Sequence, residues 1–361
     1  MADDRLHEAM IRKAISLARK GEGYTAPNPM VGAVVFNKDG IIATGYHKKV
    51  GEPHAEAVAL RKAGERARGA SIAVNLEPCC HEGRTPPCTQ AIIKTGIKKV
   101  IFSITDPFLR VCGRGGRLLQ ENDIEVIKGI CREEAEKLNE VYLHNTATGR
   151  PFVVLKMAQS LDGRIASATG HSQWISCPEA LKFAHRLRSR YDAVAVGSGT
   201  ARVDNPQLNV HRVKGPNPIR IIVTTSATLP KNLQLFTENK DYNTVVATTK
   251  DIIKKGVYGN VITWQVRKKQ GRLDPEDFIR MLGEAGVTSV LIEGGSQLAT
   301  SLLKRKLVDK LYLITAPMII GAGVEAIGDL GVKKIADSIR FTDYGSRKLG
   351  TDNLFWGYPE K

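Results

Sequence analysis

The residues best suited to chemistry in this sequence are one histidine, one glutamate and two cysteines that lie close together. They occur in the segments Pro-His-Ala-Glu at 53–56, Leu-Glu-Pro-Cys-Cys-His at 76–81 and Thr-Pro-Pro-Cys at 85–88. Catalytic zinc takes three protein ligands and leaves its fourth position to water. One imidazole nitrogen and two sulfurs suit zinc better than magnesium or calcium. We therefore predict that His54, Cys79 and Cys88 bind zinc.

Glu56 is expected to carry protons at this site rather than to act as a fourth ligand. Residues 55–67 are rich in helix formers and follow Pro53, which predicts a helix with His54 at its entrance. Two positions along a helix correspond to a rotation of about 200°, so His54 and Glu56 are poor co-ligands. A lone histidine or cysteine is more often structural, and only the combination indicates a metal site.

The two cysteines are predicted to lie at the ends of two different elements. Residues 71–76 predict a buried strand that delivers Cys79 at its end. The two prolines before Cys88 predict the start of a helix that continues to a cap at Gly96. Cys88 would then lie in a first helical turn, where the helix dipole favours the thiolate.

The rest of the first half predicts an α/β unit. Apolar positions at helical spacing indicate a helix over 5–20, and later segments indicate strands that end at Phe36 and cover 41–46 and 99–104. This order of elements is typical of a mixed sheet with flanking helices. Asn28 lies between two prolines, which indicates either a rigid extended segment or a plain turn.

Length and composition indicate a soluble protein of two domains. The chain has 361 residues, of which 42% are hydrophobic and 25% charged. Its longest apolar run, 311–323, is interrupted by Thr315 and Pro317, so we expect a core strand there and no membrane association. The N-terminus lacks the pattern of a signal peptide, and six cysteines do not form a disulfide framework. A cytoplasmic location is therefore expected.

The net charge of +16 has two explanations, which are a nucleic-acid surface or a preference for phosphorylated small molecules. Lysines and arginines are scattered, apart from short clusters at 186–190 and 333–334, and aromatic residues make up only 6% of the chain. Charge alone does not decide between the two.

The second half contains two glycine-rich turns that suit a phosphate. A polar segment at 145–151 marks the expected domain boundary after a charged helix over 132–141. Beyond it, predicted strands lead into Gly-Ser-Gly-Thr at 197–200 and Glu-Gly-Gly-Ser at 293–296. A glycine turn between a strand and a helix presents backbone N–H groups to an anion. Neither turn matches the dinucleotide fingerprint, so a standard dinucleotide fold is not expected.

The motifs together resemble a known enzyme family. The His-x-Glu and Pro-Cys elements are similar to the cytidine-deaminase-like superfamily of zinc deaminases. In this sequence the second cysteine follows the first by nine positions, across an insert at 80–87. That insert, with Asn-Pro-x-Val-Gly at 28–32, Asp-Pro at 106–107 and Gly-Arg-Gly at 113–115, resembles the bifunctional deaminase/reductases of riboflavin biosynthesis. The resemblance covers nearly the whole chain.

This resemblance implies a fold and a two-step function. It implies an α/β chain with a cytidine-deaminase-like zinc domain at 1–146 and a dihydrofolate-reductase-like domain at 147–361 that uses NADPH. The implied substrate is 2,5-diamino-6-ribosylamino-4(3H)-pyrimidinone 5′-phosphate. Hydrolytic deamination by the first domain and reduction of the ribosyl group to ribityl by the second would give 5-amino-6-(5-phospho-D-ribitylamino)uracil.

The resemblance also implies the residues around each ligand. The deaminase substrate would be oriented by Asn28, His47 and Asp106. The NADPH site would be lined by Ala158, Trp174, Thr200, Asp204, Thr225 and the segment Gly294, Gly295, Ser296 to Ser301. The reductase substrate would be contacted by Lys156, Ser172, Arg188, Leu208 and Glu293. An arginine fork binds two phosphate oxygens at once, although Arg188 could equally lie on a solvated helix face and Trp174 in the core.

The sequence departs from the family pattern at four places: Cys80 replaces a usual serine, Phe108-Leu109 a usual Asn-Pro, Thr224-Thr225 a usual Asp-Ser, and His211-Arg212 obscures one substrate position. Two alternative functions follow from the same residues. The chain could be a tRNA base deaminase with an accessory nucleotide-binding domain, or its second half could be a non-catalytic nucleotide sensor. The resemblance favours a small-molecule enzyme that binds no nucleic acid and forms a homo-oligomer.

Overall fold

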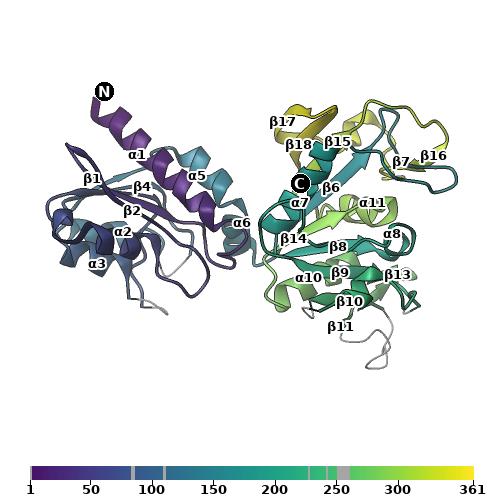
Figure 1. Ribbon diagram of the computed structural model, residues 1–361, viewed down its shortest axis with the longest axis horizontal. Helices are drawn as coiled ribbons and strands as arrows, with labels where there is room; N and C mark the ends of the chain where they lie inside the picture. The colour runs from purple at the N-terminus through teal and green to yellow at the C-terminus, as the bar shows by residue number, and fades with distance from the viewer. Residues whose placement is uncertain (1, 83–85, 109–110, 227, 241–242, 250–260) are drawn as a thin grey trace. The chain divides into compact units, whose positions relative to one another are not determined.

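The computed structural model describes residues 2–82, 86–108, 111–226, 228–240, 243–249 and 261–361. The chain divides into two compact units, Met1–Gly149 and Arg150–Lys361 (Figure 1). Each unit has its own sheet and its own hydrophobic core, so the predicted α/β class is confirmed.

The first unit is built on a five-stranded mixed sheet in the order β2-β1-β3-β4-β5. Its strands are β1 (Gly32–Asn37), β2 (Gly40–Tyr46), β3 (Ser71–Leu76), β4 (Lys99–Ile104) and β5 (Glu125–Lys128). The β1–β2 and β1–β3 pairs are antiparallel, whereas the β3–β4 and β4–β5 pairs are parallel. This confirms the predicted mixed sheet and adds β5, which the sequence patterns did not indicate.

Helices cover both faces of this sheet. They are α1 (Ala2–Ala18), α2 (Ala55–Ala63), α3 (Cys88–Lys94), α4 (Arg114–Gln120), α5 (Arg132–Leu138) and α6 (Glu140–Thr148). Short 3₁₀ turns follow α1 at Arg19–Gly21 and α2 at Gly64–Ala67. Alternate strand residues face opposite sides. Val35 packs in one core with residues of α2 and α3, while its neighbour Phe36 packs in another with residues of α1 and α5.

The helix predicted over 132–141 is interrupted in the structure. It separates into α5 and α6 at Asn139, whose backbone leaves the helical region with φ −101° and ψ 22°. The Asn139 amide bonds both the N–H and the C=O of Met30, at 2.8 and 3.0 Å. Helix α6 then continues to Thr148, so part of the polar stretch predicted as a linker is helical.

The second unit contains a nine-stranded sheet in the order β11-β10-β9-β8-β14-β6-β15-β18-β17. Its strands are β6 (Phe152–Gln159), β8 (Ala193–Gly197), β9 (Ile219–Thr224), β10 (Thr244–Thr248), β11 (Ile262–Gln265), β14 (Ser289–Glu293), β15 (Lys310–Thr315), β17 (Phe341–Leu349) and β18 (Asp352–Pro359). The strands from β11 to β15 in this order run parallel to one another. Strand β18 runs antiparallel to β15, and β17 runs antiparallel to β18. Two small ribbons pair β12 (Lys268–Lys269) with β13 (Arg272–Leu273), and β7 (Arg164–Ser167) with β16 (Gly323–Glu325).

The helices of the second unit are α7 (Pro178–Arg190), α8 (Ser198–Asp204), α9 (Gln234–Thr237), α10 (Pro275–Glu284) and α11 (Ser296–Lys304), with a 3₁₀ turn at Ile335–Asp337. Phe278 of α10 and Leu302 of α11 pack on the sheet in the main core. The apolar run predicted as a core strand forms β15 up to Thr315 only. No helix in the described part of the chain has both the length and the hydropathy that crossing a bilayer requires.

Two candidate active sites

Strand direction brings the candidate deaminase residues to one edge of the first sheet. Because β3 and β4 are parallel, Cys79 after β3 and Asp106 after β4 leave the sheet at the same edge. Because β1 and β2 each run antiparallel to a neighbour, Asn28 before β1 and His47 after β2 meet them there. Residues far apart in the sequence thus converge as a consequence of the strand order.

The three predicted metal ligands lie together at this edge. The ligating atoms of His54, Cys79 and Cys88 all lie within 4.8 Å of one another. His54 Nδ1 is 3.3 Å from the Cys88 sulfur and 3.6 Å from the Cys79 sulfur. Bond lengths of about 2.0 Å to nitrogen and 2.3 Å to sulfur require edges of roughly 3.5 Å in a tetrahedron. The donor set and its spacing therefore fit zinc.

Each ligand is held by the element that was predicted for it. His54 is the N-cap of α2, and Cys88 is the first residue of α3. The backbone N–H of Cys88 donates to the Cys79 sulfur at 3.4 Å. Hydrogen bonds from the Cys88 thiol and the His54 ring lower the pKa of Cys79 to about 4, whereas the bond to Cys79, together with burial, raises the pKa of Cys88. The first N–H of α3 thus points to the Cys79 sulfur, so the start of this helix contacts both cysteines.

Glu56 lies in the first turn of α2 and is buried, with 3% of its surface exposed. Burial, with the nearby Cys79 sulfur, raises the pKa of Glu56 to about 7. A carboxyl group with this pKa can both accept and return a proton near neutral pH. The structure thus places a carboxyl group suited to proton transfer beside the three candidate ligands, and Glu56 does not belong to that group of three.

His47 and Asn28 form a hydrogen-bonded pair next to the cluster. The His47 ring lies 5.6 Å from the His54 ring, centroid to centroid. Its Nδ1 lies 3.3 Å from the Pro53 carbonyl oxygen, which can only accept, so Nδ1 carries the proton. Its Nε2 then accepts from the Asn28 Nδ2 at 3.3 Å. This arrangement leaves the Asn28 Oδ1 as an acceptor.

Two buried asparagines hold the loop that contains Asn28. Asn75 accepts from the backbone N–H of Gly32 at 2.8 Å and donates to the carbonyl of Met30 at 2.9 Å. Asn139 contacts the same Met30 backbone from the α5–α6 junction. These positioning residues were missed at the sequence level, because nothing in their local pattern shows which distant loop they contact.

Asp106 is held from two sides. Its Oδ1 accepts from the Tyr142 hydroxyl at 2.7 Å and from the Phe108 N–H at 2.9 Å, so Oδ2 is the oxygen without these partners. Burial raises the pKa of Asp106. Glu77 accepts from the backbone N–H groups of Asp106, Gly113 and Gly116, at 3.2, 2.9 and 2.9 Å. Glu77 thereby ties the Cys79 loop to the Asp106 loop.

Two of the four departures from the family pattern, at Cys80 and Phe108, lie in the first unit beside this site. The Phe108 ring packs near the ring of His81, with 5.7 Å between centroids. Cys80 is partly buried but does not belong to the group of three ligands found among the described residues. Leu109 and the insert residues 83–85 lie outside the described residues.

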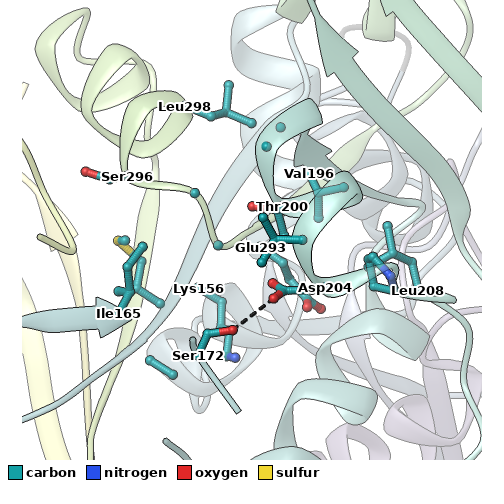
Figure 2. Close-up of a pocket in the computed structure, with 18 of the residues that line it drawn as sticks. Lys156, Ile165, Ser172, Val196, Thr200, Asp204, Leu208, Glu293, Ser296 and Leu298 are labelled. Atoms are coloured by element: carbon teal, nitrogen blue, oxygen red, sulfur yellow. Dashed lines mark hydrogen bonds between the residues drawn. The ribbon is translucent and has the colours of Figure 1, made fainter. Parts of the chain in front are cut away.

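The second unit contains a cavity of about 820 Å³ at the carboxyl ends of its parallel strands. The residues predicted for the reductase half line it, from Lys156 and Ala158 on β6 to Gly294, Gly295, Ser296 and Ser301 after β14. Within the predicted segment 294–301, Ala299 and Thr300 do not line the cavity. Figure 2 shows Ser172, Thr200, Asp204, Leu208 and Glu293 around this cavity. The Ser172 hydroxyl donates to Asp204 at 2.9 Å. The sheet therefore assembles residues that no local motif connects.

The second glycine turn needs its glycines. Gly294 and Gly295 have φ of 60° and 77°, in the left-handed region that favours glycine. A Cβ on Gly295 would lie 3.1 Å from the Thr200 Oγ1 of the first glycine turn. The two turns therefore approach each other with bare backbone beside the N-terminus of α11. This geometry fits a diphosphate.

A buried ionic cluster forms the floor of the cavity. Glu293 on β14 pairs in register with Lys156 on β6. Arg188 donates to both oxygens of Glu293, from Nε at 2.7 Å and from Nη2 at 2.8 Å. Burial, with the charge of Arg188, lowers the pKa of Lys156, although Glu293 opposes this. The Arg188 side chain is only 14% exposed, so the solvated alternative is wrong. Its contact with the substrate stays a prediction.

The cavity wall also contains Trp174, for which the sequence left two readings open, and His185, which the sequence analysis did not identify. Trp174 is 68% exposed, which excludes a core role. His185 was missed, although its position three residues before Arg188 places both on one face of α7. Its ring lies 4.2 Å from the ring of His211. Burial, together with Arg188 and His211, lowers the pKa of His185 to about 4.

Comparison with family models assigns each half separately. Residues 4–104 match the cytidine and deoxycytidylate deaminase zinc-binding region, and residues 151–355 match the RibD C-terminal domain. The first match contains all three clustered residues, which are His54 before α2, Cys79 after β3 and Cys88 at the start of α3. The second match contains the whole described cavity lining.

Full-length relatives are similar over both halves. The chain is 38% identical to a riboflavin biosynthesis protein RibD of Actinobacillus pleuropneumoniae, over 95% of this chain and 93% of that protein. It is 40% identical to RibD of Aquifex aeolicus, over 95% of each. Its structure is similar to that of Acinetobacter baumannii RibD, with a TM-score of 0.90, 34% identity, and coverage of 99% of this chain and 100% of that one.

Proposed function

The chain belongs to the RibD family of riboflavin biosynthesis proteins, and from this membership we propose how its two sites divide a deamination and a reduction. The chain is a bifunctional deaminase and reductase with a zinc-binding deaminase domain and an NADPH-dependent reductase domain. We assign the deaminase to residues 1–146 and the reductase to residues 147–361. The observation on which the proposal rests is the co-existence, in one chain, of a zinc-fitting ligand set beside Glu56 and a glycine-lined cavity beside Lys156.

In the first step, the pyrimidine loses its 2-amino group to water. We assign His54, Cys79 and Cys88 as the zinc ligands, and bound zinc supplies a Lewis acid and a water with a pKa lowered to about 7. Glu56 accepts a proton from water and returns protons to the ring nitrogen and the departing ammonia. Its pKa of about 7 supports both transfers.

The ring is oriented by Asn28 and Asp106. The acceptor oxygen that His47 leaves on Asn28 suits an amino or ring N–H group. Asp106 presents Oδ2 to a second donor, because Tyr142 and the Phe108 N–H occupy Oδ1. In this assignment His47 acts by fixing Asn28, and Tyr142 acts by fixing Asp106.

In the second step, the ribosyl group is reduced at C1′. NADPH, when bound, supplies the hydride. The backbone of Gly294–Ser296 and the N-terminus of α11 would hold its diphosphate. Ring opening at C1′ leaves a new hydroxyl that requires one proton, and the Lys156 ammonium is the donor next to Glu293. Arg188 fixes the Glu293 carboxylate on the strand next to Lys156.

The substrate class is a small molecule, and the finer assignment is 2,5-diamino-6-ribosylamino-4(3H)-pyrimidinone 5′-phosphate. A structure of the Thermotoga maritima relative is described as a diaminohydroxyphosphoribosylaminopyrimidine deaminase and 5-amino-6-(5-phosphoribosylamino)uracil reductase, which supports this choice. That chain is 34% identical with a TM-score of 0.86. Relatives that match both halves leave the tRNA deaminase and the nucleotide sensor without a supporting observation.

The cytoplasm is the proposed compartment, since all six cysteines are free thiols, as a reducing environment favours. A homo-oligomer is proposed from the family resemblance, and the mass of the purified protein in solution by light scattering tests it.

The function is tested with purified chain, the diaminopyrimidine phosphate and NADPH, by following ammonia release and NADPH absorbance in parallel. We expect ammonia to appear without NADPH, and NADPH oxidation to require the deaminated product. NADPH oxidation on the undeaminated substrate at an equal rate would contradict the assigned order. Ammonia release without any NADPH oxidation would contradict a working reductase.

A further inference from the structure

The two ends of the reductase cavity carry different charged side chains. One end lies at β6 and β14, where Lys156 and Glu293 meet. The other lies beyond β9, where Thr225 and Arg272 line the wall. In the sheet order β10-β9-β8-β14-β6, the glycine turns after β8 and β14 lie between these two ends.

Arg272 reaches the far end from the β12–β13 hairpin. The segment before this hairpin is fixed to the end of β10 by a bond from the Val266 N–H to the Thr248 carbonyl, at 2.8 Å. The hairpin closes through a bond from the Asp274 N–H to the Arg267 carbonyl, at 2.9 Å. Its attachment beyond β10 places Arg272 on the side of the cavity farthest from β6.

The direction of the cofactor follows from the proposed function, on which this inference rests. A dinucleotide whose reacting end lies at Lys156 and whose diphosphate lies on Gly294–Ser296 must extend its adenosine end toward β9 and β10. NADPH differs from NADH only by a phosphate on that adenosine ribose. A phosphate dianion there requires a positive partner.

The other cationic residues of the wall lie at the opposite end. Arg188 is committed to Glu293. Arg212 follows His211, whose ring contacts His185 on the same helix as Arg188. Among the described lining residues, Arg272 is therefore the cation at the β9 end, and its side chain is exposed to the cavity.

We propose that Arg272 binds the 2′-phosphate of NADPH and thereby selects NADPH over NADH. A guanidinium fork donates two parallel hydrogen bonds to phosphate oxygens, which a lysine cannot do. The wall beside it is held in place, since the Thr249 hydroxyl donates to the Thr225 carbonyl at 3.0 Å. The loop motifs of the sequence do not contain this selectivity, which arises from a hairpin more than seventy positions after the first glycine turn.

The test compares both cofactors on the full chain, with the deaminated substrate. Arg272→Gln is expected to raise the KM for NADPH by about tenfold to a hundredfold, with kcat and the KM for NADH unchanged. The KM of Arg272→Lys for NADPH is expected to lie between those of the unaltered chain and Arg272→Gln. Adenosine 2′-monophosphate should bind Arg272→Gln more weakly by the same factor, whereas adenosine 5′-monophosphate should bind both proteins equally.

Lys269→Gln is the matched control. Lys269 pairs with Arg272 across the same hairpin, lies outside the cavity and contacts Glu276 at 3.4 Å. Its loss removes one positive charge without removing the proposed phosphate ligand, so the NADPH to NADH ratio should not change. An unchanged ratio in Arg272→Gln, or an equal change in Lys269→Gln, would overturn the proposal. Absence of NADPH oxidation by the unaltered chain would instead overturn the reductase proposal. Binding of adenosine 2′-monophosphate does not depend on turnover, so it tests the role of Arg272 separately.

Discussion

The two sites of this chain are built in opposite ways. In the first unit, three ligating atoms from residues 54–88 lie within 4.8 Å, and short elements fix each one. In the second unit, the cavity draws on residues from Lys156 to Val324, and the order of the strands brings these distant segments together. A metal site is thus encoded by local spacing, whereas a dinucleotide site is encoded by strand order. If the two sites are independent, a change in one site should leave the activity of the other unchanged.

Loss of a ligand should produce the largest effect. Cys88→Ala is expected to abolish zinc binding and ammonia release, because two donors no longer complete a catalytic zinc site. Reduction of the deaminated substrate should remain at the level of the unaltered chain. Metal analysis and the two separate assays check this. The control is Cys112→Ser, which alters an exposed cysteine outside the cluster and should change neither activity.

Glu56→Gln sharpens the comparison by leaving the ligands intact. The amide cannot carry protons, so ammonia release should fall by about 10²–10⁴-fold while zinc content is retained. Near-normal ammonia release from a zinc-loaded variant would show that another group moves the protons.

Much of the first unit could be predicted from the sequence. His54 at the entrance of α2, Cys79 after β3 and Cys88 at the start of α3 follow from propensity, proline placement and period. The bond from the Cys88 N–H to the Cys79 sulfur could not be predicted, because it depends on how the Cys79 loop folds against the start of α3. Tyr142 and Asn75 also escaped prediction, since their roles depend on contacts with distant loops.

The second unit was predictable only through resemblance. Its glycine turns were visible as turns, but the approach of Gly295 to Thr200 requires β8 and β14 to be neighbours. The pairing of Arg188 with Glu293 depends on the same strand order, so it could not be predicted from local sequence.

Tyr142→Phe tests a residue that acts through another. Loss of its 2.7 Å bond should leave Asp106 less well oriented and raise the KM for deamination by about tenfold. The kcat, the zinc content and the reductase activity should change little. A fall in kcat as large as the rise in KM, or a loss of zinc, would indicate a structural role for Tyr142 instead of a positioning role.

The smallest expected effect concerns stability and pH in the second unit. His185 in the folded chain takes up a proton only near pH 4, because burial and Arg188 lower its pKa from 6.5. The unfolded chain therefore binds more protons between these values, so stability falls as the pH falls through this window. His185→Gln should reduce the decrease in Tm of this unit between pH values of about 7 and 5. Replacement of the exposed His171 by Gln should leave that decrease unchanged.

The most direct test of the central claim is removal and return of zinc in one preparation, with both activities measured on separate substrates. We expect a chelator to abolish ammonia release from the diaminopyrimidine phosphate, with recovery on addition of zinc, while NADPH oxidation on the deaminated substrate continues throughout. Ammonia release that survives complete removal of the metal would contradict the account, as would a reductase that stops when the zinc leaves.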